Sequence, residues 1–332
     1  MAFNSAPTGV TNQGDVSKDV TLNNQPEDSI SELSWSPVAN YLAVASWDKV
    51  VRIYDISHSP QGERKALFTL PGPALSCGWS SDGTKVVGAG TDGSARLIDL
   101  ASNNTQAQQI AQHDAPIRTY WDLRQYTPIG TVACPERIYA MEANGNNLLI
   151  ATADKYLALV DLNQPTTIAR TIQSPLKHQT RAVSWIPNGT VYAVASIEGR
   201  CAINYVDESN KSQNFTFRCH RQPKDNDHKN QLVYAVNAVS FHPRYHQVFS
   251  TAGADGTFCF WDKDAHHRLK GFTAGGPITS TSFNHDGSIF AYAISYDWSK
   301  GYSHNTRDHP TKVVLHPVSD AECKPKQKTN QG

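Results

Sequence analysis

Residues 41–55 read YLAVASWDKVVRIYD and place two apolar runs on either side of a short acidic turn. The runs Tyr41–Ala45 and Val50–Asp55 are rich in the β-branched and aromatic residues that favour strands. The turn between them, Trp47-Asp48-Lys49, has the polar composition that tight turns prefer. This stretch therefore predicts a β-hairpin.

The same acidic turn recurs along the whole chain. It is found at Trp47-Asp48-Lys49, Thr91-Asp92-Gly93, Ala153-Asp154-Lys155, Ile197-Glu198-Gly199, Ala254-Asp255-Gly256 and Tyr296-Asp297-Trp298. Most of these acids recur with a period in the low forties, which is typical of four-stranded propeller blades. Because no stretch carries a convincing helical period, we predict one all-β domain, a β-propeller of seven repeats.

The third repeat is incomplete. The longest interval between the acids, from Asp92 to Asp154, contains a further repeat end, Trp121-Asp122-Leu123. This repeat end follows the previous one, at Asp99, after only about half the length of a normal repeat. The sequence runs from a normal repeat start directly into a repeat end at the junction Thr119-Tyr120, so about 20 to 26 residues of the interior are missing. We expect unpaired strand edges and bare apolar faces on both neighbouring blades. A tolerated deletion and a skipped exon both remain open as its origin.

The repeats set the expected domain limits. Residues 1–27 are polar and contain an alternating stretch at about 16–22 that is suited to close the ring beside residues 311–315. The propeller is expected at 28–318, and the polar residues 319–332 are expected to be a disordered tail.

Composition excludes several functional classes. Thirty basic residues balance thirty acidic ones, so no overall field attracts nucleic acid or an anionic membrane. The six cysteines form no C-x-x-C pair, which argues against a zinc site or a disulfide framework. The sequence offers neither a secretion signal nor a membrane-spanning run, so we expect a nuclear or cytosolic protein.

The sequence contains no motif that predicts an enzyme. Gly88–Gly93 matches G-x-G-x-x-G, but a strand-like run follows it where a dinucleotide site needs a helix. A hydrolytic propeller would need a nucleophile with a base within reach, and the sequence nominates none. We predict no cofactor, no metal and no catalysis.

Cations and aromatic residues gather instead in the turns of the later repeats. The candidate partner-binding residues are Arg200, Arg221, Trp47, Lys177 and Arg181. Arginine captures carboxylates in a bidentate manner, and tryptophan supplies an apolar anchor. The pattern predicts a ligand segment that is acidic and partly apolar.

Longer motifs carry a resemblance to a known family. They are Ala45-Ser46-Trp47-Asp48, His113-Asp114-Ala115-Pro116-Ile117, Ser174-Pro175-Leu176-Lys177-His178-Gln179, Ser196-Ile197-Glu198-Gly199-Arg200, Phe217-Arg218-Cys219-His220-Arg221, Phe260-Trp261-Asp262-Lys263-Asp264 and Tyr296-Asp297-Trp298-Ser299-Lys300-Gly301. In this order, over about residues 28 to 316, the chain resembles the WD-repeat mRNA export factors of the nuclear pore. A sister family, the mitotic-checkpoint propellers, shares the motifs around Arg200 and Arg221, whereas residues 296–301 favour the export factors.

The resemblance implies a non-enzymatic WD-repeat adaptor that binds the GLEBS segment of an FG-nucleoporin and supports nuclear mRNA export. It implies a monomeric propeller in a heterocomplex at the nuclear envelope that shuttles to the cytoplasm. By analogy, Arg200 and Arg221 face acidic ligand side chains and Trp47 packs nearby, while Trp298 and Lys300 are candidates for contact with RNA or a messenger ribonucleoprotein. The alternative is a spindle-checkpoint adaptor that binds GLEBS-like segments of kinases.

Overall fold

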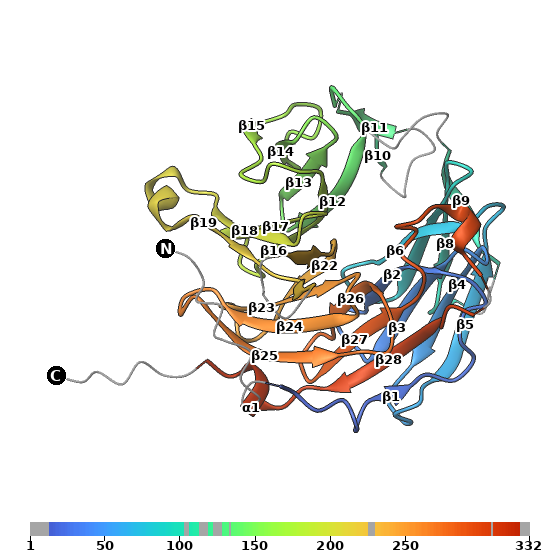
Figure 1. The fold of residues 1–332 in the computed structure, drawn as a ribbon. Helices are drawn as coiled ribbons and strands as arrows, with labels where there is room; N and C mark the ends of the chain where they lie inside the picture. Colours follow the sequence, from blue (N-terminus) through green and yellow to red (C-terminus); the bar gives the residue numbers. More distant parts are fainter. Residues whose placement is uncertain are drawn as a thin grey trace.

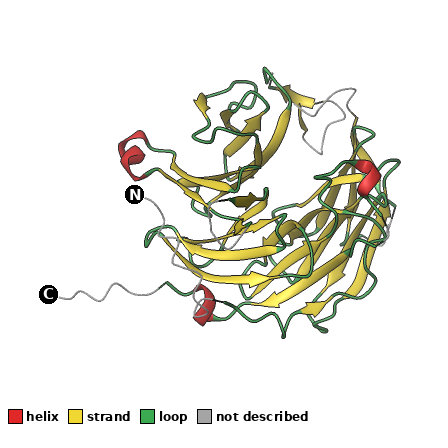
Figure 2. Cartoon of the chain, viewed as in Figure 1, coloured by secondary structure: helices red, strands yellow, loops and turns green. Residues whose placement is uncertain are grey.

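A computed structural model shows that the apolar runs form antiparallel sheets arranged around a common centre (Figure 1). It describes residues 13–102, 106–112, 119–121, 128–132, 134–224, 230–306 and 308–325, with the backbone alone for 119–121 and 128–131. Within these described residues six sheets have four strands each, and almost all of the structure is strand and loop (Figure 2). The prediction of an all-β propeller is confirmed.

The blades follow the sequence repeats. Blade 1 consists of β2 (Ile30–Trp35), β3 (Tyr41–Ser46), β4 (Val50–Asp55) and β5 (Glu63–Thr69), and blade 2 of β6 (Ala74–Trp79), β7 (Lys85–Gly90), β8 (Ser94–Asp99) and β9 (Gln108–Gln112). Blade 4 consists of β12 (Ile138–Asn144), β13 (Asn147–Thr152), β14 (Tyr156–Asp161) and β15 (Arg170–Gln173), and blade 5 of β16 (Thr180–Trp185), β17 (Val191–Ser196), β18 (Arg200–Tyr205) and β19 (Phe215–Arg218). Blade 6 consists of β22 (Val236–Phe241), β23 (Val248–Gly253), β24 (Thr257–Asp262) and β25 (His267–Thr273), and blade 7 of β26 (Ile278–Phe283), β27 (Ile289–Ile294), β28 (Lys312–Pro317) and β1 (Val20–Thr21).

Blade 3 is the incomplete member that the sequence predicts. Within the described part of the chain, only β10 (Thr119–Trp121) and β11 (Pro128–Thr131) pair there, as a two-stranded sheet. The first strands of neighbouring blades pack in the order β6, β2, β26, β22, β16, β12, so this series ends at the two strands that flank the short repeat. The predicted junction Thr119-Tyr120 lies within β10. In the part of the repeat that the structure describes, blade 3 therefore contains a two-stranded sheet where the other blades have four strands.

The acidic turns share one backbone conformation, which explains why they recur. The residue after each acidic side chain has a positive φ: Lys49 at 75°, Gly93 at 74°, Lys155 at 66°, Gly199 at 60°, Gly256 at 73° and Trp298 at 62°. At Asp48 and Asp255 the carboxylate accepts a hydrogen bond from the backbone N–H two residues on, that of Val50 at 3.0 Å and that of Thr257 at 3.1 Å. Aspartate suits this role because its short side chain bonds to the backbone two residues on.

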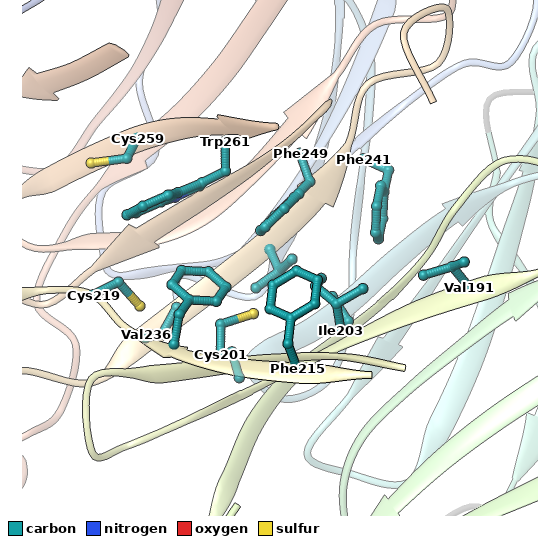
Figure 3. Packing of buried hydrophobic residues seen from close by; sticks show 14 of the residues in the cluster. Val191, Cys201, Ile203, Phe215, Cys219, Val236, Phe241, Phe249, Cys259 and Trp261 are labelled. Carbon is teal, nitrogen blue, oxygen red and sulfur yellow. The ribbon is translucent and has the colours of Figure 1, made fainter. Parts of the chain in front are cut away.

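Apolar clusters between the blades make the core. Between blades 5 and 6, for example, Ile203, Phe215, Phe249 and Trp261 are buried together with three thiols, those of Cys201, Cys219 and Cys259 (Figure 3). These three cysteines form no disulfide and are buried, and burial raises the pKa of each thiol. They therefore act as small apolar core residues.

The N-terminal and C-terminal segments meet at blade 7. In the ring-closing region, β1 pairs with β28, with Val20 opposite Leu315. The expectation of a disordered tail from residue 319 is wrong for residues 319–325. Helix α1 (Asp320–Cys323) forms there because Glu322 accepts a hydrogen bond from the N–H of Ser319 at 2.9 Å and Cys323 is fully buried. Residues 1–12 and 326–332 of the expected terminal segments lie outside the described residues.

Candidate partner-binding face

One end of the propeller carries every candidate residue. In each blade, the turn between the second and third strands lies at the end where the first strand begins, because successive strands are antiparallel. Trp47, Trp298 and Lys300 lie in such turns, and Lys177 and Arg221 lie in segments that precede first strands. Arg200 and Arg181 are the first residue of β18 and the second residue of β16, at the same end of their blade. The topology therefore places the whole predicted set on the same face.

Arg200 and Arg221 converge on a single carboxylate. Arg200 Nε lies 3.3 Å and Arg221 Nη2 lies 3.7 Å from Oε1 of Glu198. Arg221 Nη2 also donates to the carbonyl oxygen of Glu198 at 2.9 Å, which fixes its guanidinium against the turn. Burial, then the charges of Arg218 and Arg200, lower the pKa of Arg221, which shows that the cations repel one another. One carboxylate thus faces several cations, so an added anion is favoured here.

Lys177 and Arg181 border this cluster. Lys177 lies on the segment that enters β16, Arg181 is the second residue of that strand, and both side chains are exposed. That segment is joined to the Glu198 turn because the N–H of Ile197 donates to the carbonyl of Gln179 at 3.1 Å. His178 Nε2 also lies 3.5 Å from Oε2 of Glu198. The structure therefore brings four of the five predicted partner-binding residues into one region of blades 5 and 6.

His220 is a site residue that sequence reasoning did not nominate. Its buried ring lies between Asp255, 2.9 Å from Nδ1, and the hydroxyl of Thr251, 2.9 Å from Nε2. The backbone of His220 is left-handed, with φ of 49°, and the next residue is Arg221. The ring thus anchors to blade 6 the turn that presents Arg221. The sequence did contain a signal for this contact: His220 directly precedes the candidate Arg221, and Asp255 is one of the repeated turn acids.

Apolar side chains stand beside the cations. Ile197, Leu232 and Val233 are 42%, 40% and 42% exposed. Val233 lies on β21 (Gln231–Val233), directly opposite Arg221 on β20 (Arg221–Pro223). Exposed apolar and basic groups therefore lie together in this region.

Trp47 and Trp298 form one aromatic pair. Their ring centroids are 4.3 Å apart, so the turns of blades 1 and 7 touch. Tyr296 packs beside Trp298 at 5.7 Å and accepts a hydrogen bond from the N–H of Lys300 at 3.0 Å. The side chain of Lys300 is exposed. Trp47 therefore lies next to Trp298, one of the candidate RNA-binding residues. Arg200 and Arg221 lie instead at blades 5 and 6.

Among the described residues, no three histidine, cysteine, aspartate or glutamate side chains gather as metal ligands would. No helix in that part of the chain has the length and apolar composition needed to cross a membrane.

Comparison with known proteins identifies close relatives. A family model described as WD domain, G-beta repeat, matches residues 19–55, 64–99 and 215–262. The chain is 56% identical to the WD40 repeat protein poxJ of Penicillium oxalicum over 342 residues, covering 96% of this chain and 98% of that protein. It is 50% identical to the mRNA export factor GLE2 of Chaetomium thermophilum over 346 residues, covering 96% of each chain. It is 47% identical to the Poly(A)+ RNA export protein of Schizosaccharomyces pombe over 352 residues, covering 98% of each chain.

These alignments are longer than the chain itself. Since 96% of 332 residues is about 319, about 23 of the 342 positions aligned with the Penicillium oxalicum protein have no counterpart here. That number corresponds to one hairpin of a repeat with a period in the low forties.

Proposed function

Because this chain belongs to the family of WD-repeat mRNA export factors, we propose that it is a non-enzymatic adaptor of nuclear mRNA export. It binds the GLEBS segment of an FG-nucleoporin through the face that carries Arg200 and Arg221. It works as a monomeric propeller in a heterocomplex, in the nucleus and at the nuclear pore, and it shuttles to the cytoplasm. Two relatives named for the export of mRNA or poly(A)+ RNA support the export role.

The observation that carries the proposal is the excess of cations around Glu198. Arg200 and Arg221 share this one carboxylate, and Lys177 and Arg181 are exposed beside it. An acidic side chain of the nucleoporin segment would relieve the repulsion between the arginines and accept hydrogen bonds from guanidinium groups that are already ordered. Ile197, Leu232 and Val233 supply contacts for the apolar residues of the same segment.

The aromatic pair supports a second contact within the export complex. Flat aromatic side chains next to a cation form the usual platform for single-stranded nucleic acid, because bases stack on the rings and phosphates pair with the charge. Trp298, Trp47 and Lys300 have this combination on blades 1 and 7. We therefore assign single-stranded RNA of a messenger ribonucleoprotein to this part of the face.

The alternative function is that of a spindle-checkpoint adaptor, since the motifs around Arg200 and Arg221 also resemble those of the mitotic propellers. Kinase segments of the GLEBS type would use the same arginines. Affinities for a nucleoporin GLEBS peptide and a kinase GLEBS-like peptide, measured side by side with the full chain, separate the two. Tighter binding of the kinase peptide would reject the export assignment.

The site itself is tested by charge reversal. Arg200→Glu should weaken binding of the nucleoporin peptide at least about tenfold, because it turns an attraction into a repulsion. Lys211→Glu is the matched control, since Lys211 is an exposed cation in the same blade but follows β18 at the opposite end of the propeller. Equal affinities for the two variants, measured by isothermal titration calorimetry, would refute the site.

A further inference from the structure

The acid in the blade 5 turn differs from its counterparts in the other blades. Glu198 is the one glutamate among the six repeated turn acids, and the other five are aspartates. Four of these aspartates accept a hydrogen bond from the backbone N–H two residues on, at 3.0 to 3.4 Å: Asp48, Asp154, Asp255 and Asp297. The hydrogen bonds of the described residues include none to the carboxylate of Glu198, although its Oε2 is buried. This carboxylate therefore does not stabilise its own turn in the way that the aspartates do.

The carboxylate of Glu198 lies instead among cationic side chains, and it is held loosely. Its Oε1 is 3.3 Å from Nε of Arg200 and 3.7 Å from Nη2 of Arg221. Its Oε2 is 3.5 Å from Nε2 of His178. A well-fitted hydrogen bond between a cation and a carboxylate measures about 2.7 to 2.9 Å, so each of these contacts is longer than the optimum. Glu198 therefore offsets part of the positive charge here without being fixed by any one contact.

The backbone of the turn, rather than the carboxylate, holds Arg221 in place. Its Nη2 donates to the carbonyl oxygen of Glu198 at 2.9 Å, and its Nε donates to that of Gly199 at 3.4 Å. The same carbonyl of Gly199 accepts from the N–H of Cys219 at 3.0 Å. A Cβ atom added at Gly199 would lie 2.7 Å from the carbonyl oxygen of Cys219, so the turn is tightly packed. The position of the Arg221 guanidinium is therefore independent of the charge on the Glu198 side chain.

The charges around Arg221 act in opposite directions on an acidic ligand. Burial lowers the pKa of Arg221, the charges of Arg218 and Arg200 lower it further, and the charge of Glu198 raises it without restoring the ordinary value. A carboxylate that approaches the guanidinium groups is attracted by the arginines and repelled by Glu198, because the sign of each interaction follows from the charges alone. Glu198 thus opposes the class of ligand that its neighbours attract.

We infer that Glu198 is a built-in competitor of the acidic ligand, and that its carboxylate occupies the place beside Arg200 and Arg221 that a ligand carboxylate takes over on binding. This inference rests on the proposed function, in which the ligand is the acidic nucleoporin segment, and it adds how that site is regulated. A ligand carboxylate can pair with a guanidinium through two short hydrogen bonds, which Glu198 does not make at its present distances. The displaced side chain still has the exposed His178 beside its Oε2.

This role makes Glu198 a determinant of specificity as well as of affinity. An anion that gains less from the guanidinium groups than Glu198 does will not displace it, so weakly pairing anions are kept away from the arginines. A repulsive group placed against the wrong partners is a general device of selective binding sites. Glu198 therefore lowers the affinity for the acidic segment and reserves the arginines for a ligand that pairs with them well.

The test is Glu198→Gln in the full-length chain, which removes the charge and keeps the size of the side chain. This variant should bind a nucleoporin GLEBS peptide at least about threefold more tightly than the parent, since one partly exposed charge pair has an effect of this size. Isothermal titration calorimetry measures the change. Glu208→Gln is the matched control and should bind like the parent, because Glu208 is an exposed glutamate of the same blade at the opposite end of the propeller. Unchanged binding by Glu198→Gln would overturn the inference, and so would weaker binding, which would mean that the carboxylate orders the arginines for the ligand.

A second variant, Glu198→Asp, keeps the charge but shortens the side chain. It should fold like the parent, because the other five turns carry aspartate, and its carboxylate should accept from the N–H of Arg200 as that of Asp48 does from Val50. The charge is then drawn back toward the turn, so binding of the peptide should lie between that of the parent and that of Glu198→Gln. Weaker binding than the parent would contradict the role of Glu198 as a competitor.

The result is distinguishable from a failure of the proposed function. If Arg200→Glu and Lys211→Glu bind the peptide equally well, the nucleoporin site is refuted and the inference about Glu198 falls with it. If Arg200→Glu weakens binding but Glu198→Gln does not strengthen it, the site stands and only the inference about Glu198 is overturned.

Discussion

Nδ1 of His220 lies 2.9 Å from Oδ1 of Asp255, and both side chains are buried at the contact between blade 5 and blade 6. Burial by itself would raise the pKa of Asp255, but the hydrogen bond and charge of His220 and the hydrogen bonds of Thr257 lower it. Thr251 continues the network, since its hydroxyl contacts Nε2 of His220 and accepts from Nε1 of Trp261, each at 2.9 Å. The turn that carries Arg221 is therefore tied to the core of blade 6.

His220→Phe should lower the free energy of unfolding by about 2 to 4 kcal/mol, because it leaves the buried groups of Asp255 and Thr251 without their partner. Urea denaturation measures the change. His246→Phe, at an exposed histidine of the same blade, is the control and should stay within about 0.5 kcal/mol of the parent. Equal loss in both variants would mean that the network does not stabilise the fold.

His316 should make stability depend on pH in the alkaline range. Burial lowers the pKa of His316, but its contacts with Asp19 at 2.6 Å and Glu322 at 3.5 Å outweigh this effect and raise the pKa from 6.5 to about 9. A pKa raised by folding contributes stability that is complete below pH 6.5 and is lost as the pH rises through 9. His316→Gln should remove this slope and cost on the order of 3 kcal/mol at pH 6. Unfolding curves that keep the same slope in the variant would contradict the assignment.

Glu142 should weaken the fold at high pH. Its carboxyl accepts from the N–H of Trp185 at 2.8 Å, and burial raises its pKa from 4.5 to about 8. The folded state then holds this proton more tightly than the unfolded state, so stability falls as the pH rises from 4.5 to 8. Glu142→Gln keeps the acceptor and should be more stable than the parent by about 1 kcal/mol or more at pH 8.5, with no difference near pH 5. The exposed Glu208→Gln serves as the control in the same thermal melts and should show no such crossover.

The contact between Trp47 and Trp298 should couple blades 1 and 7. Aromatic pairs at this separation contribute about 0.5 to 1.5 kcal/mol beyond the area they bury. A double-mutant cycle of Trp47→Ala and Trp298→Ala, followed by urea unfolding, should give a coupling energy in that range. The same cycle with Tyr302→Ala in place of Trp298→Ala should give none. Additive losses in the first cycle would show that the rings do not interact in solution.

The arrangement of the blades could be predicted from the sequence because a blade is a local structure. Alternation of apolar and polar residues marks the strands, and the acid before a left-handed residue marks each turn, as at Asp48 and Lys49. Counting these turns also located the incomplete repeat, which the structure shows as β10 and β11. The C-terminal helix was missed although Ser319 and Glu322 have the spacing of a capping box. Its remaining contacts are long-range: Cys323 is buried in the apolar cluster between blades 6 and 7, and Glu322 lies 3.5 Å from His316 of blade 7.

The sequence by itself determined the propeller, its broken repeat and the types of residue on the binding face. Only the tertiary structure decided which of these residues meet. Arg200 and Arg221 share Glu198 because β18 and β20 converge at one end of the propeller, and Trp47 pairs with Trp298 because closing the ring brings the blade 1 turn against the blade 7 turn. Such contacts join residues that lie in different repeats or different strands of the chain. Their geometry depends on how each sheet is rotated against the next, and this rotation is set by packing between blades rather than by the order of residues within one.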